Sequence, residues 1–216
     1  MKKVLISLLI IYLLSVPVSA TSIEISLNAN EACAITEIVF KSYFSGNYIS
    51  KGFNIDYENY AFTSITYDEK TCDWIVTYDL TDEGYYRIFG FERGRYFIFS
   101  DEWVSHVSFY INKNSCEIPV MRVGHTVAFT LSNPSTIKPE YPVKDHVLLA
   151  SESDAILVSN ILFKAIFTND IYSSISIKEN IPNHEWQISY YFDNGSIFEI
   201  HINRGTLKIG YLGFQN

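Results

Sequence analysis

Residues Glu31–Asn47 read EACAITEIVFKSYFSGN, and residues Asp154–Asn169 read DAILVSNILFKAIFTN. Both stretches place apolar residues three and four positions apart, which predicts an amphipathic helix with one buried face. Both also contain Phe-Lys-x-x-Phe near their ends, at Phe40–Phe44 and Phe163–Phe167. The chain therefore contains an internal repeat, and the same supersecondary unit is expected twice.

Two further landmarks follow each predicted helix in the same order. Trp74–Tyr78 (WIVTY) matches Trp186–Tyr190 (WQISY), and Ile111–Ile118 (INKNSCEI) matches Ile202–Ile209 (INRGTLKI). Runs that mix β-branched and aromatic residues predict strands. Each repeat is therefore expected to be one helix packed on a curved antiparallel sheet, an α+β fold. Residues that recur at equivalent positions are expected to be structural, and the predicted core anchors are Trp74, Trp186, Tyr78 and Tyr190.

The first repeat is longer than the second, and the largest difference is an aromatic stretch at Gly84–Ser100 (GYYRIFGFERGRYFIFS). Two aromatic runs flank the polar residues Glu92–Arg95, which predicts an inserted β-hairpin. Alternation would place aromatic side chains on both faces of this hairpin, so a single layer could not bury them all. We expect either that the second repeat packs over them or that they bind a partner, because aromatic residues and arginine dominate binding hot spots. The predicted partner-binding residues are Tyr85, Phe89, Phe91, Arg93, Arg95 and Phe97.

The start of the chain predicts export. Residues 1–20 carry Lys2 and Lys3, then a mostly apolar run and a small-residue exit, which is the pattern of a removable secretory signal. An uncleaved membrane anchor is the alternative, but the apolar run is short for a membrane span. The Met-Lys-Lys start is typical of bacteria, so a periplasmic or secreted location is expected. The predicted domains are residues 21–131 for the first repeat, residues 132–143 for a linker with three prolines, and residues 144–216 for the second repeat.

Composition and charge restrict the class of partner. The chain has 216 residues, 48% of them hydrophobic, which is enough for packed cores and too apolar for disorder. Its formal net charge is −8, and removal of the signal lysines makes the mature chain more acidic. An acidic chain is a poor match for nucleic acid phosphates or an anionic membrane surface. It suits a basic protein partner, although solubility alone also explains the charge.

Three cysteines, Cys33, Cys72 and Cys116, all lie in the first repeat. In an oxidising compartment an odd count suggests one disulfide and one free thiol. The preferred pair is Cys33–Cys116, which would join the start of the first helix to the last hairpin of its sheet. Cys72–Cys116 is the alternative pair, and in the preferred arrangement Cys72 is free.

The order of these landmarks resembles the cystatin-like or nuclear-transport-factor-like layout. Ala155–Leu212 is similar to immunity proteins of that fold in bacterial toxin systems, which share an alanine-bearing helix, a strand that starts with Trp, and a closing Ile-x-Ile-x-[Lys/Arg]-Gly turn, here Ile200–Gly205. Those families often carry Gly-Gly before the penultimate strand, where this chain has Asn194–Ser196 (NGS). The first repeat matches only in outline, although a bridge from its helix start to its last hairpin is similar to that of colicin M immunity-type domains. The resemblance implies a periplasmic protein that neutralises a toxin by binding it.

Sequence patterns for catalysis and metal binding are missing. The chain contains no Gly-x-Ser-x-Gly and no Cys-x-x-Cys, and its five histidines are scattered, so no catalytic residue, metal or cofactor is expected. The preferred hypothesis is a non-enzymatic immunity or inhibitor protein that occludes a basic toxin or an envelope hydrolase. One alternative is an exported small-ligand-binding or isomerase-like protein, because nuclear-transport-factor-like barrels host isomerases with a carboxylate and tyrosines in an apolar pocket. The other alternative is an envelope assembly factor.

Overall fold

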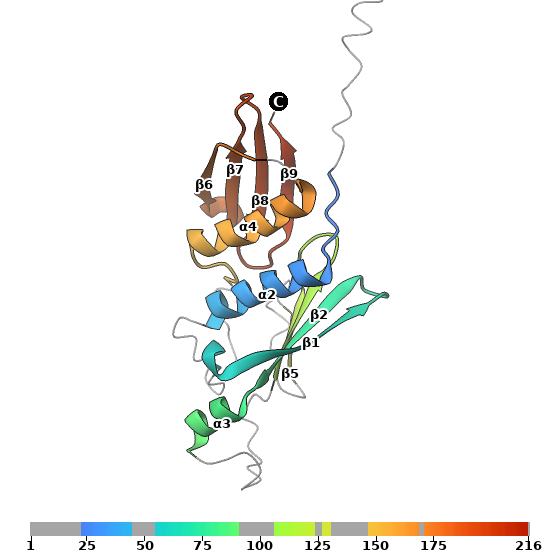
Figure 1. The fold of residues 1–216 in the computed structure, drawn as a ribbon, viewed down its shortest axis with the longest axis vertical. Coiled ribbons are helices and arrows are strands. Elements are labelled where there is room, and N and C mark those ends of the chain that lie inside the picture. The colour runs from blue at the N-terminus through green and yellow to red at the C-terminus, as the bar shows by residue number, and fades with distance from the viewer. Residues whose placement is uncertain are drawn as a thin grey trace, which may run out of the picture.

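The computed structural model of the protein describes residues 23–44, 55–90, 106–123, 127–130, 147–168 and 171–215. Within these residues the chain is an α+β protein with two antiparallel sheets (Figure 1). The predicted secretory signal and the predicted linker at residues 132–143 lie outside the described part of the chain. No described helix is both long and apolar enough to cross a membrane.

The first repeat contains one long helix and a five-stranded sheet. Its helix α2, Ala29–Phe44, starts at a reciprocal cap, in which Asn28 Oδ1 accepts from Glu31 N and Glu31 Oε2 accepts from Asn28 N. The strands pair in chain order, β1-β2-β3-β4-β5. The elements after α2 are η1 (Tyr57–Asn59), β1 (Tyr60–Asp68), β2 (Asp73–Leu80), α3 (Asp82–Phe89), β3 (His106–Asn112), β4 (Val120–Val123) and β5 (Val127–Thr130).

The second repeat contains one long helix and a four-stranded sheet. Its helix α4, Glu152–Ile166, starts at Ser151, whose hydroxyl accepts from Asp154 N at 3.1 Å. The strands again pair in chain order, β6-β7-β8-β9. They are β6 (Ser174–Asn180), followed by the 3₁₀ turn η3 (Ile181–Asn183), then β7 (Glu185–Tyr191), β8 (Ile197–Asn203) and β9 (Ile209–Phe214).

The two helices lie between the two sheets. Each helix packs against the central strands of its own sheet, α2 on β2 and β3 and α4 on β7 and β8, and the helices also pack against each other (Figure 1). The buried side chains of both repeats form one continuous hydrophobic cluster, with Phe40 and Phe163 at equivalent positions. Each predicted amphipathic helix therefore packs on two neighbours, its own sheet and the helix of the other repeat.

Backbone hydrogen bonds join the repeats in a reciprocal way. Ile118 N donates to Thr206 O at 2.8 Å, and Ile209 N donates to Ser115 O at 3.2 Å. Ser115 and Ile118 occupy the same places in the first repeat as Thr206 and Ile209 in the second. Each repeat thus gives and receives the same bond, which is the pattern of a two-fold interface within a single chain.

The predicted hairpin at Gly84–Ser100 is wrong in its first half, because these residues form helix α3. Thr81 Oγ1 accepts from Gly84 N at 2.9 Å as the N-cap, and Asp82 and Glu83 occupy the first turn, where carboxylates are favoured. Gly90, with φ 73°, ends the helix. These capping residues outweigh the β-propensity of the aromatic residues between them. Residues 91–100 lie outside the described part of the chain.

The last strands of the two repeats match in register. β3 pairs with β4 through Val107–Val123 and Phe109–Met121, and β8 pairs with β9 through Phe198–Phe214 and Ile200–Leu212. Each of these residues in the second sheet follows its counterpart in the first by the same number of positions. The sheets differ beyond this point, because β4 is followed by β5 and β9 is the edge of its sheet.

Candidate functional site

Trp74 and Trp186 tie the second strand of each sheet to the segment before its helix. The indole N–H of Trp74 donates to Leu27 O at 2.9 Å, and that of Trp186 donates to Leu149 O at 3.1 Å. Trp186 is buried, and Trp74 packs partly buried against the core. Both indoles have their single donor occupied inside the fold, so their position suits a structural role.

Tyr78 and Tyr190 join each sheet to its helix by one hydroxyl. Tyr78 Oη lies 3.2 Å from Thr36 Oγ1, and Tyr190 Oη lies 2.7 Å from Ser159 Oγ. Both tyrosines are buried, and burial is the main cause that raises the pKa of each phenol well above its ordinary value. A phenol that stays protonated at all physiological pH values serves here as a fixed hydrogen-bonding group.

A third equivalent contact shapes the turn after β3 and the turn after β8. Asn112 Oδ1 accepts from the amides of Asn114 and Ser115, and Asn203 Oδ1 accepts from the amides of Gly205 and Thr206. The next residues, Cys116 and Leu207, have positive φ angles of 60° and 61°. The shared Ile-Asn landmark of the sequence is therefore a backbone turn, and neither asparagine is directed at a ligand.

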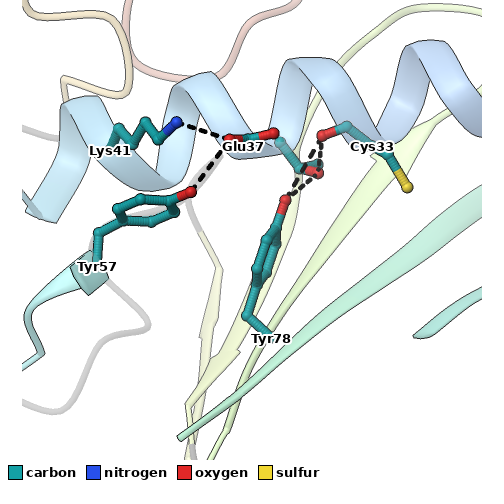
Figure 2. A network of polar contacts seen from close by, with 6 residues as sticks. Cys33, Glu37, Lys41, Tyr57 and Tyr78 are labelled. Carbon is teal, nitrogen blue, oxygen red and sulfur yellow. Dashed lines mark hydrogen bonds and ion pairs between the residues drawn. The ribbon is translucent and has the colours of Figure 1, made fainter. Parts of the chain in front are cut away.

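A polar network on helix α2 distinguishes the first repeat (Figure 2). Glu37 Oε1 accepts from Lys41 Nζ at 2.6 Å and from Tyr57 Oη at 3.1 Å. The hydrogen bond from Lys41 lowers the pKa of the Glu37 carboxyl. In the second repeat Asn160 occupies the place of Glu37 and accepts from Tyr172 Oη at 3.3 Å. A tyrosine hydroxyl donates to the residue at this position in both repeats, but only in the first repeat is that residue charged and paired with a lysine.

The inserted helix α3 rests on the 3₁₀ turn η1. Gly84 faces Asn59 so closely that a Cβ atom at Gly84 would lie 2.8 Å from Asn59 Cα. Thr81 N and Thr81 Oγ1 both donate to Asn59 O, at 2.9 Å and 3.1 Å. These contacts hold helix α3 against η1. The second repeat has no equivalent of α3, because residues 192–196 join β7 directly to β8.

Helix α3, the turn η1 and the strand β1 that follows it carry carboxylates and two exposed aromatic residues. Tyr86 on α3 is 56% exposed, and Phe62 on β1 is 51% exposed. Arg87 forms an ion pair with Glu83 at 2.6 Å, within α3. The carboxylates on these two elements and their caps are Asp56, Glu58, Asp82 and Glu83. Aromatic residues surrounded by negative charge suit a basic protein surface.

The predicted partner-binding residues fall in three groups. Tyr85 lies on α3 and packs partly buried against the core. Phe89 is the last residue of α3, where the predicted hairpin had placed it on a strand. Phe91, Arg93, Arg95 and Phe97 lie outside the described residues. Sequence reasoning missed Tyr86 and Phe62 as the exposed aromatic residues, and the helix caps around α3 were the signal that could have found Tyr86.

The structure contains no disulfide between the cysteines. Cys33, Cys72 and Cys116 are free thiols, so the expected Cys33–Cys116 bridge and the alternative Cys72–Cys116 bridge are both absent here. Cys116 is fully buried, and burial raises the pKa of its thiol to about 12. Formation of a bridge during export stays a prediction.

One group of catalytic residue types does meet on the second sheet. Ser189 Oγ donates to Glu199 Oε1 at 3.0 Å, and His201 Nε2 lies 3.5 Å from Glu199 Oε2. In a nucleophilic triad the histidine stands between the serine and the carboxylate, so that it can take the serine proton. Here the carboxylate stands in the middle, so the histidine does not contact the serine and the arrangement differs from that triad. Within the described ranges, no group of three or more His, Cys, Asp or Glu side chains is placed to hold a metal ion.

No family model, no curated protein and no solved structure matches this chain.

Proposed function

We propose that this protein is an exported, non-enzymatic binding protein, an immunity or inhibitor protein of cystatin-like or nuclear-transport-factor-like repeats that neutralises a secreted bacterial toxin or envelope hydrolase by occluding it. The observation that carries the proposal is the inserted helix α3. It is docked on η1, belongs to one repeat only, and presents exposed Tyr86 among carboxylates.

The internal contacts support a binding role over a catalytic one. The tryptophan, tyrosine and asparagine contacts occur in both repeats and connect strands to helices or close turns. Hydrogen bonds of this kind stabilise a fold and leave no reactive group aimed at a substrate. The acidic net charge favours encounter with a basic protein.

The isomerase-like alternative has less support. It needs an apolar space between helix and sheet, and in the first repeat Phe40 fills that space together with the rings of Tyr60, Tyr78 and Phe109. Asp73, the nearest carboxylate in sequence to the tryptophan strand, is buried and accepts from Asn112 Nδ2 at 3.0 Å. The space between α2 and its sheet is therefore filled by aromatic rings, and the Asp73 carboxylate already has a hydrogen-bond partner inside the fold.

The test is capture of a partner by the mature chain from culture fluid and envelope extract of the producing bacterium. Wild type is expected to retain a basic toxin or hydrolase in stoichiometric amount and to inhibit its activity. Tyr86→Ala with Phe62→Ala is expected to reduce capture at least about tenfold, as loss of two hot-spot side chains does. Leu157→Ala, on the second repeat and 52% exposed in the wild type, is the matched control.

Three results would contradict the proposal. Equal capture by the double variant and the control would remove the α3 surface as the binding site. Capture of a structural envelope component with no enzyme or toxin would favour the assembly-factor alternative. Retention of a partner whose activity is unchanged would exclude occlusion.

A further inference from the structure

The second sheet has an open edge at the place where the first sheet has another strand. β4 and β9 correspond residue by residue in their pairing with β3 and β8. On its other side β4 pairs with β5, through Met121–Phe129 and Val123–Val127. β9 is the last strand of the four-stranded sheet. The internal duplication therefore shows what kind of element fits beside β9: a short antiparallel strand.

The backbone of β9 is oriented for such a strand. Gln215 N donates to Ile197 O at 2.9 Å, so alternation along the strand turns Tyr211 and Gly213 toward β8 and turns Leu212 and Phe214 away from it. Leu212 and Phe214 correspond to Met121 and Val123, which are the two residues of β4 that face β5. The free edge thus offers the same main-chain groups that pair with β5 in the first repeat.

Side-chain exposure agrees with a missing neighbour. Met121, beside β5, is 2% exposed. Its counterpart Leu212 is only partly buried, and Phe214 is 44% exposed. These apolar side chains lie at alternate positions along the open edge, where a neighbouring strand with apolar residues at every second position would cover them.

A groove runs along the start of this edge. It has a volume of about 510 Å³ and is lined by Ile209–Leu212, by Ile23–Ile25, and by Asn114 and Ser115. In Figure 1 the segment of Ile23–Ile25, drawn in blue, runs beside the β9 side of the second sheet. Main-chain pairing with β9 already exists beside the groove, where Ile209 N donates to Ser115 O.

We propose that this groove binds an extended strand of a partner protein, which pairs antiparallel with β9 and carries apolar residues opposite Leu212 and Phe214. Addition of a strand to a free sheet edge is a common mode of peptide recognition, in which main-chain bonds give affinity and alternate side chains give specificity. The proposal rests on the proposed function in one respect, since the strand belongs to the protein that this chain binds.

The Ile23–Ile25 side of the groove favours a single extended strand over a second copy of the chain as the bound partner. Pairing with the β9 edge of a second copy would bring that copy's whole sheet against the Ile23–Ile25 segment, which already flanks this edge. A single extended segment needs only the width of one strand, about 4.8 Å from the edge. One contact must be exchanged on binding: the Tyr211 hydroxyl donates to Phe214 O at 3.1 Å, and the incoming amide replaces it.

The probe is a synthetic peptide with the sequence of Gly124–Leu131 (GHTVAFTL), which contains the strand that fills the equivalent place beside β4. We expect saturable binding to the full mature chain, measured by fluorescence anisotropy of the labelled peptide. Amide hydrogen exchange at Leu212 and Phe214 is expected to slow at least about tenfold in the complex. Leu212→Pro, which removes an outward-facing donor on an edge strand, is expected to abolish binding while circular dichroism stays unchanged.

Two modified peptides give a matched control that leaves the protein unaltered. N-methylation at the position of Phe129 removes an N–H that faces the edge in the β4–β5 pair, and it is expected to weaken binding about tenfold or more. N-methylation at Ala128 alters an N–H that faces away, and it is expected to have little effect. Tyr211→Phe, which frees the carbonyl of Phe214, is expected to bind at least as tightly as wild type.

No saturable binding at millimolar peptide, or equal loss from both methylated peptides, would overturn the inference. Self-association that Leu212→Pro abolishes would also overturn it, because the occupant would then be a second copy. The failure is distinguishable from that of the proposed function. If the peptide binds but no toxin or hydrolase is captured, the strand-binding groove is supported and the neutraliser role is contradicted. If a toxin or hydrolase is captured but the peptide does not bind, the neutraliser role is supported and the strand-binding groove is contradicted.

Discussion

The two repeats share the hydrogen bonds that connect their strands, helices and turns, and they differ in the elements added at the edges of their sheets. In both, an indole N–H holds the segment before the helix, a phenol reaches a hydroxyl on the helix, and an asparagine closes the last turn. The first repeat adds helix α3 between β2 and β3 and strand β5 beside β4, and the second has neither among its described residues. The shared residues therefore define the framework, and the differences mark the surfaces where each repeat can have a separate role.

The largest expected effect tests whether the two repeats form one cooperative unit. Phe40 and Phe163 are both buried at the centre of an aromatic cluster, and both clusters belong to one continuous core. Phe40→Ala and Phe163→Ala are each expected to lower the free energy of unfolding by about 3–5 kcal/mol. Urea unfolding followed by tryptophan fluorescence should show a single transition for both variants. Two separate transitions would mean that the repeats fold independently.

A smaller effect is expected where only the first repeat has a contact. Gly84→Ala places a Cβ atom against the backbone of Asn59, so helix α3 must move away from η1. We expect a loss of about 1–3 kcal/mol in the free energy of unfolding, the usual cost of overpacking. Thermal denaturation measures the loss, and faster amide exchange in α3 with unchanged exchange in α4 locates it. Unchanged exchange in α3 would show that the helix does not depend on η1.

The tyrosine pair gives a quantitative comparison between equivalent positions. Tyr190 Oη lies 2.7 Å from Ser159 Oγ and also donates to Asn160 Oδ1 at 3.1 Å, whereas Tyr78 Oη makes contacts of 3.2 Å and 3.5 Å. Tyr190→Phe is therefore expected to cost about 1 kcal/mol and Tyr78→Phe less. Paired denaturation curves would decide the order, and a larger cost for Tyr78→Phe would contradict it.

The smallest effect concerns the ion pair that only the first repeat has. Since Lys41 lowers the pKa of Glu37, the pair contributes stability above the ordinary carboxyl pKa of about 4.3, and this contribution is lost as the pH falls through the lowered value. Glu37 and Lys41 are about half exposed, so the contribution is expected to be under about 0.5 kcal/mol. Glu37→Gln should cost this amount at pH 7 and nothing at pH 2, measured by urea denaturation. An equal cost at both pH values would show that the hydrogen bonds, and not the charge, matter.

Several parts of this fold were predictable from local patterns. The strand predicted around Trp74–Tyr78 is confirmed as part of β2, because β-branched and aromatic residues favour a strand there. The turn after β7 has a local signal in its Asn-Gly dipeptide, and Gly195 adopts a positive φ of 83°. The two helices followed from their apolar spacing and their caps.

The parts that were missed depend on competing signals or on long-range geometry. The aromatic residues of Gly84–Phe89 favour strands, but Thr81 and Gly90 cap a helix, and the caps prevailed. The contact between Ser189, Glu199 and His201 depends on strand register, which no local pattern records. The exposure of Leu212 and Phe214 follows from the position of β9 as the edge of the four described strands, which becomes visible only when the two sheets are compared.

The reciprocal bonds between Ile118 and Thr206 and between Ile209 and Ser115 have a consequence for how the molecule could be cut. Each half supplies the acceptor that the other half's amide needs, and the helix-to-helix contact supplies the apolar surface. Two polypeptides covering residues 21–130 and 147–216, produced together, should therefore recombine without a covalent link. Such fragments would form an obligate heterodimer, and their reassembly could report on any event that brings two fused proteins together.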